Sequence, residues 1–441
     1  PLLLSFFFFL GFSIKSTIIM FSLIITFSLI YLSNTLIELG MERKKVTILI
    51  LLIGLSPLAI GFTRFINMEP ILYSLSILMI SETVNILNNS KKFSSTFLRA
   101  TIIVVMSIYI KPTTGIIIFP FLLTALICNG FRKTINYCFL IFLIIILAVT
   151  PWGYRNISNG AQFPFQVWSE RSPANIRGYS NWLSKFNVTE YDHARHYYPL
   201  TFEGGDRKRI KLFINLNPFI SKEDKDYKKA FSILKNETNE TKRDFTKEEE
   251  QIFYQLAKYR SKSIGIIGNI FLFIARLFSI LLHPLNSWGI PIEIAPDPNL
   301  TIKSNNYIDY IFTFIKEVKF ELVVKLFSKL LLFLYRLIIY CLFIKEIYNL
   351  ISNFNIKEIY TKSNIYLLKN NVLLIASLFV FSSNIFIYLN LFTLLEHRYL
   401  YPFMPWLELI SYLSILYPYN SLKLNNLGIK PSKIYKNNIY N

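Results

Sequence analysis

Residues 135–151 read INYCFLIFLIIILAVTP, a run without a charged side chain that follows Arg132 and Lys133 and precedes Arg155. A helix needs about 20 apolar residues to cross the roughly 30 Å hydrocarbon core of a bilayer, where every backbone polar group must be paired. We therefore interpret this run as a membrane-spanning helix. Similar runs recur along the chain at Thr17–Ile37, Val46–Phe62, Pro70–Leu87, Val372–Asn390 and Tyr399–Leu416.

The composition of the 441 residues points the same way. The chain is 53% hydrophobic and 16% aromatic, with only 17% charged residues, which is too apolar for a soluble domain or a disordered chain. Lys and Arg exceed Asp and Glu by 20, but they fall in short clusters between apolar runs, which argues against nucleic-acid binding. We predict an all-α polytopic membrane protein, a bundle of about 8–10 transmembrane helices with an external loop subdomain.

Common soluble chemistries leave no signature. The three cysteines, Cys128, Cys138 and Cys341, lie in or beside apolar runs without disulfide or zinc spacing. The sequence contains no Walker loop, no G-x-G-x-x-G, no H-E-x-x-H and no repeat of 20 to 50 residues. No metal or cofactor is therefore expected, although a need for a divalent metal is left open.

The apolar run Thr101–Cys128 is interrupted by Lys111-Pro112-Thr113. Because proline lacks a backbone donor and restricts the residue before it, we expect two short helices that meet at a polar turn. One long helix kinked at the proline is the alternative, since membrane helices tolerate such kinks.

Short basic loops distinguish the two faces of the membrane. Met41–Lys45 carries three basic residues against one acid, and the tail after Leu416 carries four lysines and no acid. The positive-inside rule places both in the cytoplasm. An even number of predicted crossings separates these segments from further basic residues, which therefore lie on the same side: Lys91, Lys92, Arg99, Arg132 and Lys133. The loop Thr63–Glu69, the turn at Lys111 and the polar stretch after Trp152 are then external.

The external stretch separates two membrane regions. It contains Trp168, Trp182 and a mixed-charge part, Ser221–Glu250, that we expect to form surface helices and loops. The predicted organisation is an N-terminal transmembrane bundle at 1–151, an external (periplasmic) region at 152–262, a C-terminal transmembrane part at 263–418 and a basic cytoplasmic tail at 419–441.

The number of membrane crossings in the second half of the chain is ambiguous. Two apolar runs, Ile264–Leu282 and Leu330–Ile344, compete for one crossing, unless a further crossing lies near Tyr307–Val324. We expect the run Ile264–Leu282 to be re-entrant or interfacial because it contains Arg276. Lys329 and Arg336 belong to a polar stripe with Glu321 and Lys325, for which snorkelling to the interface is the favoured interpretation. Arg336 and Asn384 alone are expected to lie deep in the membrane.

Several polar residues fall at or near the external face: Arg64, Glu69, Lys111, Arg155, Arg276, His283, His397 and Arg398. A cation held at the membrane boundary needs an anionic partner, and arginine grips phosphate with a bidentate fork. Each residue taken singly fits an interfacial anchor better, so their shared sidedness carries the phosphate hypothesis. Glu69 precedes Pro70 at a predicted helix start, where it serves either as a cap or as a functional acid.

Short passages resemble the GT-C superfamily of polytopic glycosyltransferases, of the protein O-mannosyltransferase and aminoarabinose-transferase type. Leu55-Ser56-Pro57, followed by Arg64 and Met68-Glu69-Pro70, is similar to their "P … s … tE" passage. Ile110-Lys111-Pro112-Thr113 resembles their "x-[RK]-P-T" turn.

Later passages follow in the family's order. Thr150-Pro151-Trp152 with Arg155-Asn156 resembles the "PWxxRN" exit from a membrane helix, which is the most specific of the motifs. His397-Arg398-Tyr399 with Pro402 and Pro405 resembles the late "RYxxPxxP" helix start. The middle of the chain, with Tyr179, Trp182, Glu190 and Arg276, is similar to the external loop of bacterial members. The resemblance covers most of residues 50–410.

This resemblance implies a transferase that moves a sugar, with inversion, from a polyprenyl-phosphate carrier to a lipid or protein acceptor outside the bacterial inner membrane. The family's catalytic Asp lies in the first external loop, which is expected before Pro1, with Pro1–Phe12 as the loop's last part. Glu69 matches the acid of the second external loop. Lys111, Arg155, Arg276 and Arg398 match positions that hold the lipid phosphate, and Arg64 and His397 are further candidates.

Two other functions stay open. A transporter or flippase of lipid-linked sugars predicts internal repeats and ionisable residues in mid-membrane that face a pathway. A membrane assembly protein without catalysis predicts no acid in the segment upstream of Pro1. Basic residues at the external leaflet fit the enzyme best, because a departing lipid phosphate must be neutralised there.

Overall fold

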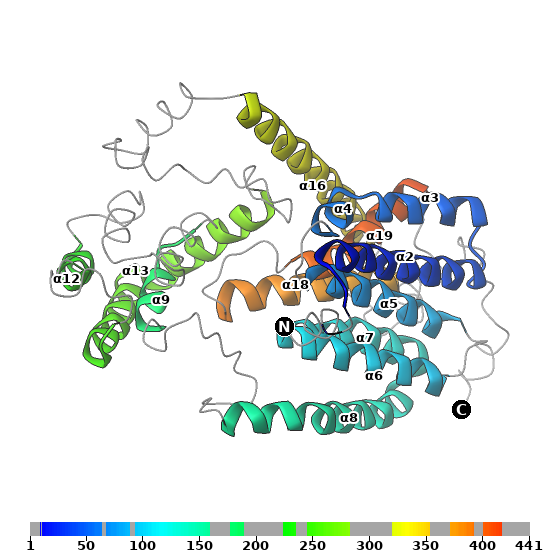
Figure 1. Ribbon diagram of the computed structural model, residues 1–441, viewed down its shortest axis with the longest axis horizontal. Coiled ribbons are helices and arrows are strands. Elements are labelled where there is room, and N and C mark those ends of the chain that lie inside the picture. The colour runs from blue at the N-terminus through cyan, green and yellow to red at the C-terminus, as the bar shows by residue number, and fades with distance from the viewer. Residues whose placement is uncertain are drawn as a thin grey trace.

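The computed structural model describes residues 9, 11–63, 68–88, 93–158, 177–188, 224–234, 245–282, 320–352, 371–391 and 400–416. These ranges fold into helices and turns, without a β-strand among them. Most of the helices pack side by side in one bundle, and α9, α12 and α13 lie to one side of it (Figure 1). The predicted all-α fold is confirmed for this part of the chain.

Six of the described helices are long and apolar enough to cross a membrane. They are α2 (Ile14–Glu38), α5 (Glu69–Leu87), α6 (Phe93–Ile110), α8 (Phe131–Ser158), α13 (Lys247–Leu282) and α16 (Phe320–Ser352). Two more apolar helices, α7 (Ile118–Asn129) and α18 (Val372–Leu391), are shorter over their apolar parts. The chain is therefore a helical polytopic membrane protein.

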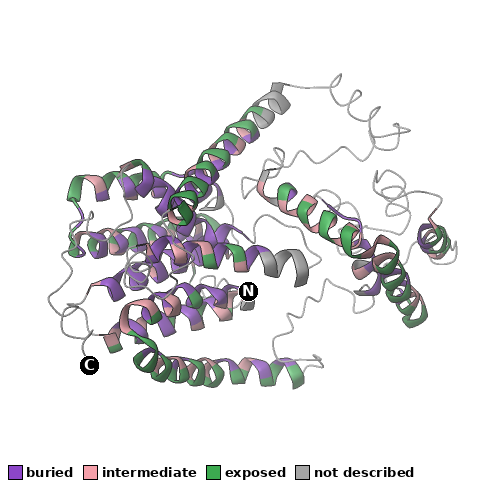
Figure 2. Ribbon diagram, turned by 180° about the vertical axis from the view of Figure 1, so that it is seen from behind, coloured by how far each residue is buried: buried purple, intermediate pink, exposed green. Residues whose placement is uncertain are grey.

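Helix α5 forms the centre of the bundle. Nearly all of its residues are buried, from Glu69 to Leu87, as the purple ribbon of Figure 2 shows. Helices α2, α6, α7 and α19 (Met404–Leu416) pack around it. Its polar side chains, Glu82 and Asn85 among them, are enclosed by these neighbours and find their hydrogen-bond partners there.

Helix α8 instead exposes an apolar flank. Phe139, Phe142, Leu143 and Leu147 are exposed, and the helix colours mostly green in Figure 2. An exposed apolar surface of this extent would drive a soluble protein to aggregate. On a membrane protein it is the surface that faces lipid.

The predicted crossing Val46–Phe62 is broken in the structure, which corrects the expectation of one continuous helix. Helix α3 (Arg43–Gly54) ends before Leu55 and Ser56, and α4 (Pro57–Thr63) begins after them. Pro57 lacks the backbone donor that a continuous helix needs there. The Ser56 hydroxyl accepts a hydrogen bond from the Ala59 amide at 3.1 Å and so caps α4.

The interruption at Lys111-Pro112-Thr113 is confirmed. Helix α6 ends at Ile110, and a short 3₁₀ helix, η1 (Pro112–Ile117), leads into α7. The Thr114 hydroxyl donates to the Ser107 carbonyl at 2.9 Å and fixes the turn. The alternative of one long kinked helix is therefore wrong.

Both helices that compete in the second half have the length and hydropathy of a membrane span. Helix α13 is broken at Gly265, whose φ of 69° is a left-handed conformation that glycine adopts readily. Beyond this break Ile266, Ile270 and Phe271 are exposed. The expectation that one of α13 and α16 does not cross stays a prediction, and most of Tyr307–Val324 lies outside the described residues.

A second, separate core lies in the region expected to be external. Helix α9 (Arg177–Leu183), α12 (Lys225–Leu234) and the first part of α13 enclose a cluster of aromatic side chains. The cluster contains Tyr179, Trp182, Phe186, Phe245 and Phe253. The Trp182 Nε1–H donates to Asp226 at 3.0 Å. The mixed-charge stretch thus contains a surface helix, α12, as expected, and it covers a tryptophan that is fully buried.

Candidate functional site

Three turns that are far apart in the sequence meet at one end of the bundle. Helix α5 begins there with Glu69, and the antiparallel helix α6 ends there, so that Lys111 precedes η1 beside α5. The short 3₁₀ helix η6 (Tyr401–Phe403), which leads into α19, packs against the same end of α5. We call this end of the bundle the Glu69 end.

Glu69 is the first residue of α5 and is followed by Pro70, as the sequence predicts. Its side chain is buried, and its carboxylate lies within electrostatic range of the Tyr401 phenol. The free backbone N–H groups of a first helical turn favour a negative charge at this position. A buried acid at a helix N-terminus, beside a loop, is suited either to capping the helix or to hydrogen bonding with a substrate hydroxyl.

Helix α8 brings Arg155 to the Glu69 end. The Tyr109 hydroxyl, two residues before Lys111, donates to the Ala148 carbonyl, and the Tyr109 ring lies 6.3 Å from the Trp152 ring. These contacts join the last turn of α6 to the outer part of α8. Arg155 is exposed in the last turn of α8, which continues to Ser158 and not to Pro151 as expected. Membrane helices tolerate an internal proline, which is the physical reason for this correction.

The described residues of the helix ends predicted to be cytoplasmic lie at the opposite end. Asn88, just after α5, donates to the Glu38 carbonyl at the end of α2, and Lys133 of α8 lies 4.6 Å from the ring of Phe93 at the start of α6. Arg99 belongs to the same region. Glu69, Lys111 and Arg155 therefore share one end of the bundle, and Arg99 and Lys133 share the other. Lys91 and Lys92 lie outside the described residues.

Arg276 has contacts that the sequence does not indicate. Its guanidinium donates to the Asn187 carbonyl at 2.8 Å and to the Ser184 carbonyl. These carbonyls follow the C-terminus of α9, where helices leave carbonyl groups without intrahelical donors. Arg276 thus ties α13 to α9. Burial and the charge of Arg276 lower the pKa of the neighbouring Lys185 amine. A phosphate-binding role for Arg276 stays a prediction.

The remaining predicted site residues, Arg64, His283, His397 and Arg398, lie outside the described residues. The catalytic Asp that the resemblance implies stays a prediction. Within the described ranges, no three His, Cys, Asp or Glu side chains come together as a metal site.

A carboxylate that the sequence interpretation passed over lies deep in the bundle. Glu408 of α19 is fully buried and accepts hydrogen bonds from Tyr73 at 2.6 Å and from Tyr335 at 2.6 Å. Tyr335 also pairs with Tyr412 at 2.9 Å, and the Ser56 hydroxyl lies near the same carboxylate. A single acid in an otherwise apolar helix was the available signal, because ionisable groups in membrane helices mark functional sites by default.

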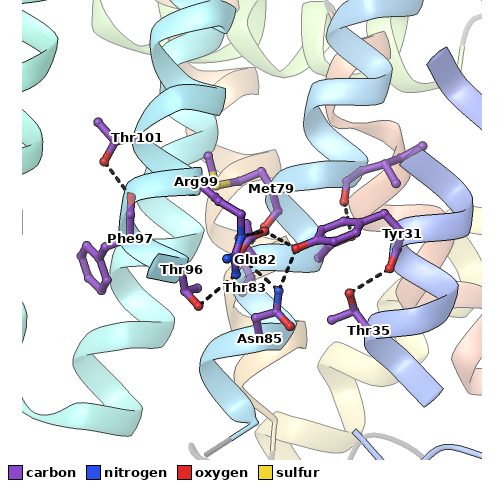
Figure 3. Close-up of polar contacts among 12 residues, drawn as sticks. Tyr31, Thr35, Met79, Glu82, Thr83, Asn85, Thr96, Phe97, Arg99 and Thr101 are labelled. Carbon is purple, nitrogen blue, oxygen red and sulfur yellow. Dashed lines mark hydrogen bonds and ion pairs between the residues drawn. The ribbon is translucent and has the colours of Figure 1, made fainter. Parts of the chain in front are cut away.

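A second buried acid, Glu82 of α5, lies near the opposite end of the bundle. Its two carboxylate oxygens accept from Arg99 Nε at 2.7 Å and Nη2 at 2.9 Å (Figure 3). Tyr31 and Asn85 complete the set at 2.7 Å and 3.2 Å. The network joins α2, α5 and α6. It corrects the interpretation of Arg99 as a loop cation, because its charge is paired with an acid inside the bundle.

The polar stripe on α16 is also corrected. Lys329 and Arg336 are both buried, so they do not snorkel to a lipid interface. Arg336 lies 5.9 Å from the Phe333 ring. Arg336 and Asn384 are buried inside the bundle, and Glu82 and Glu408 are buried as well. The depth of Arg336 and Asn384 in the membrane stays a prediction.

A comparison of the chain with protein-family models, with curated proteins and with solved structures found no match.

Proposed function

We propose that the chain is an integral membrane glycosyltransferase that moves a sugar from a polyprenyl-phosphate carrier to a lipid or protein acceptor at the external face of the membrane. The observation that supports this most is the meeting of Glu69, Lys111 and Arg155 at one end of a lipid-embedded bundle. The ordered motifs of the sequence, which resemble GT-C enzymes, supply the reaction class.

The chemistry of such a transfer requires opposite charges at one membrane surface. A base must take the proton of the acceptor hydroxyl or amine, and cations must neutralise the phosphate that leaves as the anomeric bond breaks. Glu69 supplies the carboxylate at this end of the bundle, and Lys111 and Arg155 supply the positive charges. We assign Glu69 to the acceptor and the two cations to the lipid phosphate.

The position of Arg155 suits a substrate that arrives through the lipid. Arg155 is exposed at the end of α8, and the flank of α8 below it exposes Phe142, Ile146 and Leu147. A polyprenyl chain can lie against this apolar flank while its phosphate reaches the guanidinium, which binds phosphate oxygens in a fork. Apolar contact with the chain and charge contact with the head group would then come from one helix.

The test compares two arginines of one helix. In the membrane-inserted protein, Arg155→Ala is expected to lower transfer from a defined polyprenyl-phosphate sugar at least tenfold, because a charge-assisted phosphate contact contributes about 1.5–3 kcal/mol. Arg132→Ala is the matched control, since Arg132 is equally exposed at the other end of α8. Equal transfer by the two variants would reject the assignment. Membrane insertion is checked by fractionation of both.

A transporter of lipid-linked sugars is the second candidate, and one observation favours it. Glu408 and Arg336 are ionisable, fully buried and located in helices of the bundle. Transporters place such groups along their pathways. Liposomes loaded with a labelled lipid-phosphate sugar separate the two functions, because a transporter moves the label across the bilayer without transferring the sugar to an acceptor.

A further inference from the structure

Two buried acids of the bundle, Glu82 and Glu408, differ in how their charge is compensated. Glu82 has a cationic partner, Arg99, on a neighbouring helix. Glu408 has no ion-pair partner within the described ranges, and its contacts there are hydroxyl groups. An isolated carboxylate away from water is costly, so an uncompensated acid in the membrane calls for a cation.

The groups that face Glu408 come from several of the elements packed on α19. Tyr73 comes from α5, Tyr335 from α16, Tyr401 from η6 and Ser56 from the break between α3 and α4. Helix α18 contributes no titratable side chain in its part up to Ile385. The basic residues of α3, Arg43, Lys44 and Lys45, lie in its first turn, at the other end of the bundle. Arg336 and Lys329 of α16 make no ion pair with Glu408.

The hydroxyl groups of Tyr73, Tyr335 and Tyr412 can rearrange their hydrogen bonds to accommodate one more proton on Glu408. An ionised carboxylate only accepts, and each tyrosine hydroxyl has one hydrogen to donate. With Glu408 ionised, Tyr73 donates to Oε2, Tyr335 donates to Oε1, and Tyr412 donates to Tyr335. When Oε1 binds a proton, Glu408 donates to Tyr335, and Tyr335 turns its hydrogen to Tyr412. The 2.9 Å pair of Tyr335 and Tyr412 allows either hydroxyl to be the donor.

From this geometry we infer that Glu408 is a reversible proton-binding site in the membrane, and that Tyr335 and Tyr412 reverse their hydrogen bonds when the proton binds. A hydronium ion gives the proton to Oε1, an O–H bond forms there, and a water molecule is left. No heavy atom has to move, because the same oxygen pairs stay within hydrogen-bond distance in both states. Tyr73 keeps its bond to Oε2 throughout.

The site communicates with the Glu69 end of the bundle. Tyr73 lies one helical turn after Glu69 on α5, and its ring stacks on the Tyr401 ring at a centroid distance of 4.8 Å. Residues four apart share a helix face. A change of charge at Glu408 is therefore felt at Glu69 through Tyr73 and Tyr401. The inference does not depend on the proposed function, because proton binding is observed without turnover.

Infrared spectroscopy of the protein in lipid nanodiscs tests the site. A titration with acid is expected to produce the carbonyl band of a protonated carboxylic acid, and Glu408→Gln is expected to remove it. Glu82→Gln is the matched control, since Glu82 is equally buried but paired with Arg99, and the band is expected to persist in that variant. Loss of the band in the control but not in Glu408→Gln would overturn the inference.

The tyrosines provide a test that does not require the Glu408 variant to fold. Tyr335→Phe removes a donor to the carboxylate, so the band is expected to appear about one to two pH units higher. Tyr412→Phe leaves the hydrogen bonds of Glu408 in place. It removes the hydroxyl that accepts from Tyr335 after Glu408 is protonated, so it is also expected to shift the midpoint pH at which the band appears. A midpoint unchanged in both variants, or a band displaced by Na⁺ and not by pH, would overturn proton binding at this site. Circular dichroism confirms the helical fold of each variant.

Discussion

Removing Arg99 tests how α5 and α6 are held together at the end opposite Glu69, because Glu82 is buried and Arg99 is its cationic partner. Glu82 is 1% exposed, whereas Arg99 is 40% exposed. Arg99→Ala leaves the Glu82 carboxylate with its hydrogen bonds to Tyr31 and Asn85 and without a cation. Breaking a buried ion pair by deleting one partner costs roughly 3–5 kcal/mol. Since solvent reaches the Arg99 side chain, we expect the low end, about 3 kcal/mol.

The exposure difference predicts an asymmetry between the two partners. Glu82→Gln leaves Arg99 partly in solvent, where its charge is hydrated, so the expected loss is about 1 kcal/mol. Arg99→Lys keeps the charge but not the two-pronged geometry and is expected to fall between these values. A double variant, Glu82→Met with Arg99→Met, removes both charges and is expected to be more stable than Arg99→Ala alone.

Reversible unfolding in mixed micelles of increasing SDS content measures these free energies. Arg132→Ala is the control, because Arg132 is an exposed arginine at the same end of the bundle and surface changes stay within about 0.5 kcal/mol. The reasoning is refuted if Arg99→Ala is as stable as Arg132→Ala, or if Glu82→Gln is the more damaging of the single changes.

Two further expectations concern the region that contains α9 and α12. A cysteine placed at Lys229 on α12, in a background without the three native cysteines, is expected to react with an impermeant thiol reagent in intact cells. A cysteine placed at Lys44 is expected to be protected. The opposite pattern would mean that the topology is inverted. Because the pKa of Lys185 is lowered, its amine binds fewer protons in the folded chain than in the unfolded chain. The stability of the α9 region is therefore expected to rise with pH as the ordinary pKa of 10.5 is approached. Limited proteolysis at a series of pH values measures this stability. Arg276→Ala removes one cause of the lowered pKa and is expected to flatten that rise; an unchanged profile contradicts the assignment.

Much of the fold was predictable because crossing a bilayer restricts a chain so strongly. Long apolar runs such as 135–151 have to become helices, since no other local structure pairs their backbone groups in lipid. The turn at Lys111-Pro112-Thr113 was predictable for a similar reason, because proline acts through its own ring and missing donor. The break at Ser56 was not foreseen, although Pro57 supplied the same signal, because apolar residues continue on both sides of it.

The candidate site was predictable in part. Glu69, Lys111 and Arg155 were singled out from sidedness and motifs, and the structure brings them to one end of the bundle. Arg276 was singled out too, but its binding to the Ser184 and Asn187 carbonyls depends on how α13 passes α9, which periodicity does not express. Glu408 was missed because hydropathy averages one acid into a strongly apolar helix.

The sequence by itself determined that this chain is helical, that it lies in a membrane, and which short loops share a parity. Those properties follow from local rules of hydrogen bonding, hydropathy and loop charge. Which buried charges have partners was decided by tertiary structure alone. Glu82 meets Arg99 across 17 positions, and Glu408 meets Tyr73 across 335. Pairing at such separations depends on helix packing, and the energy of a buried charge depends on the neighbours that packing supplies.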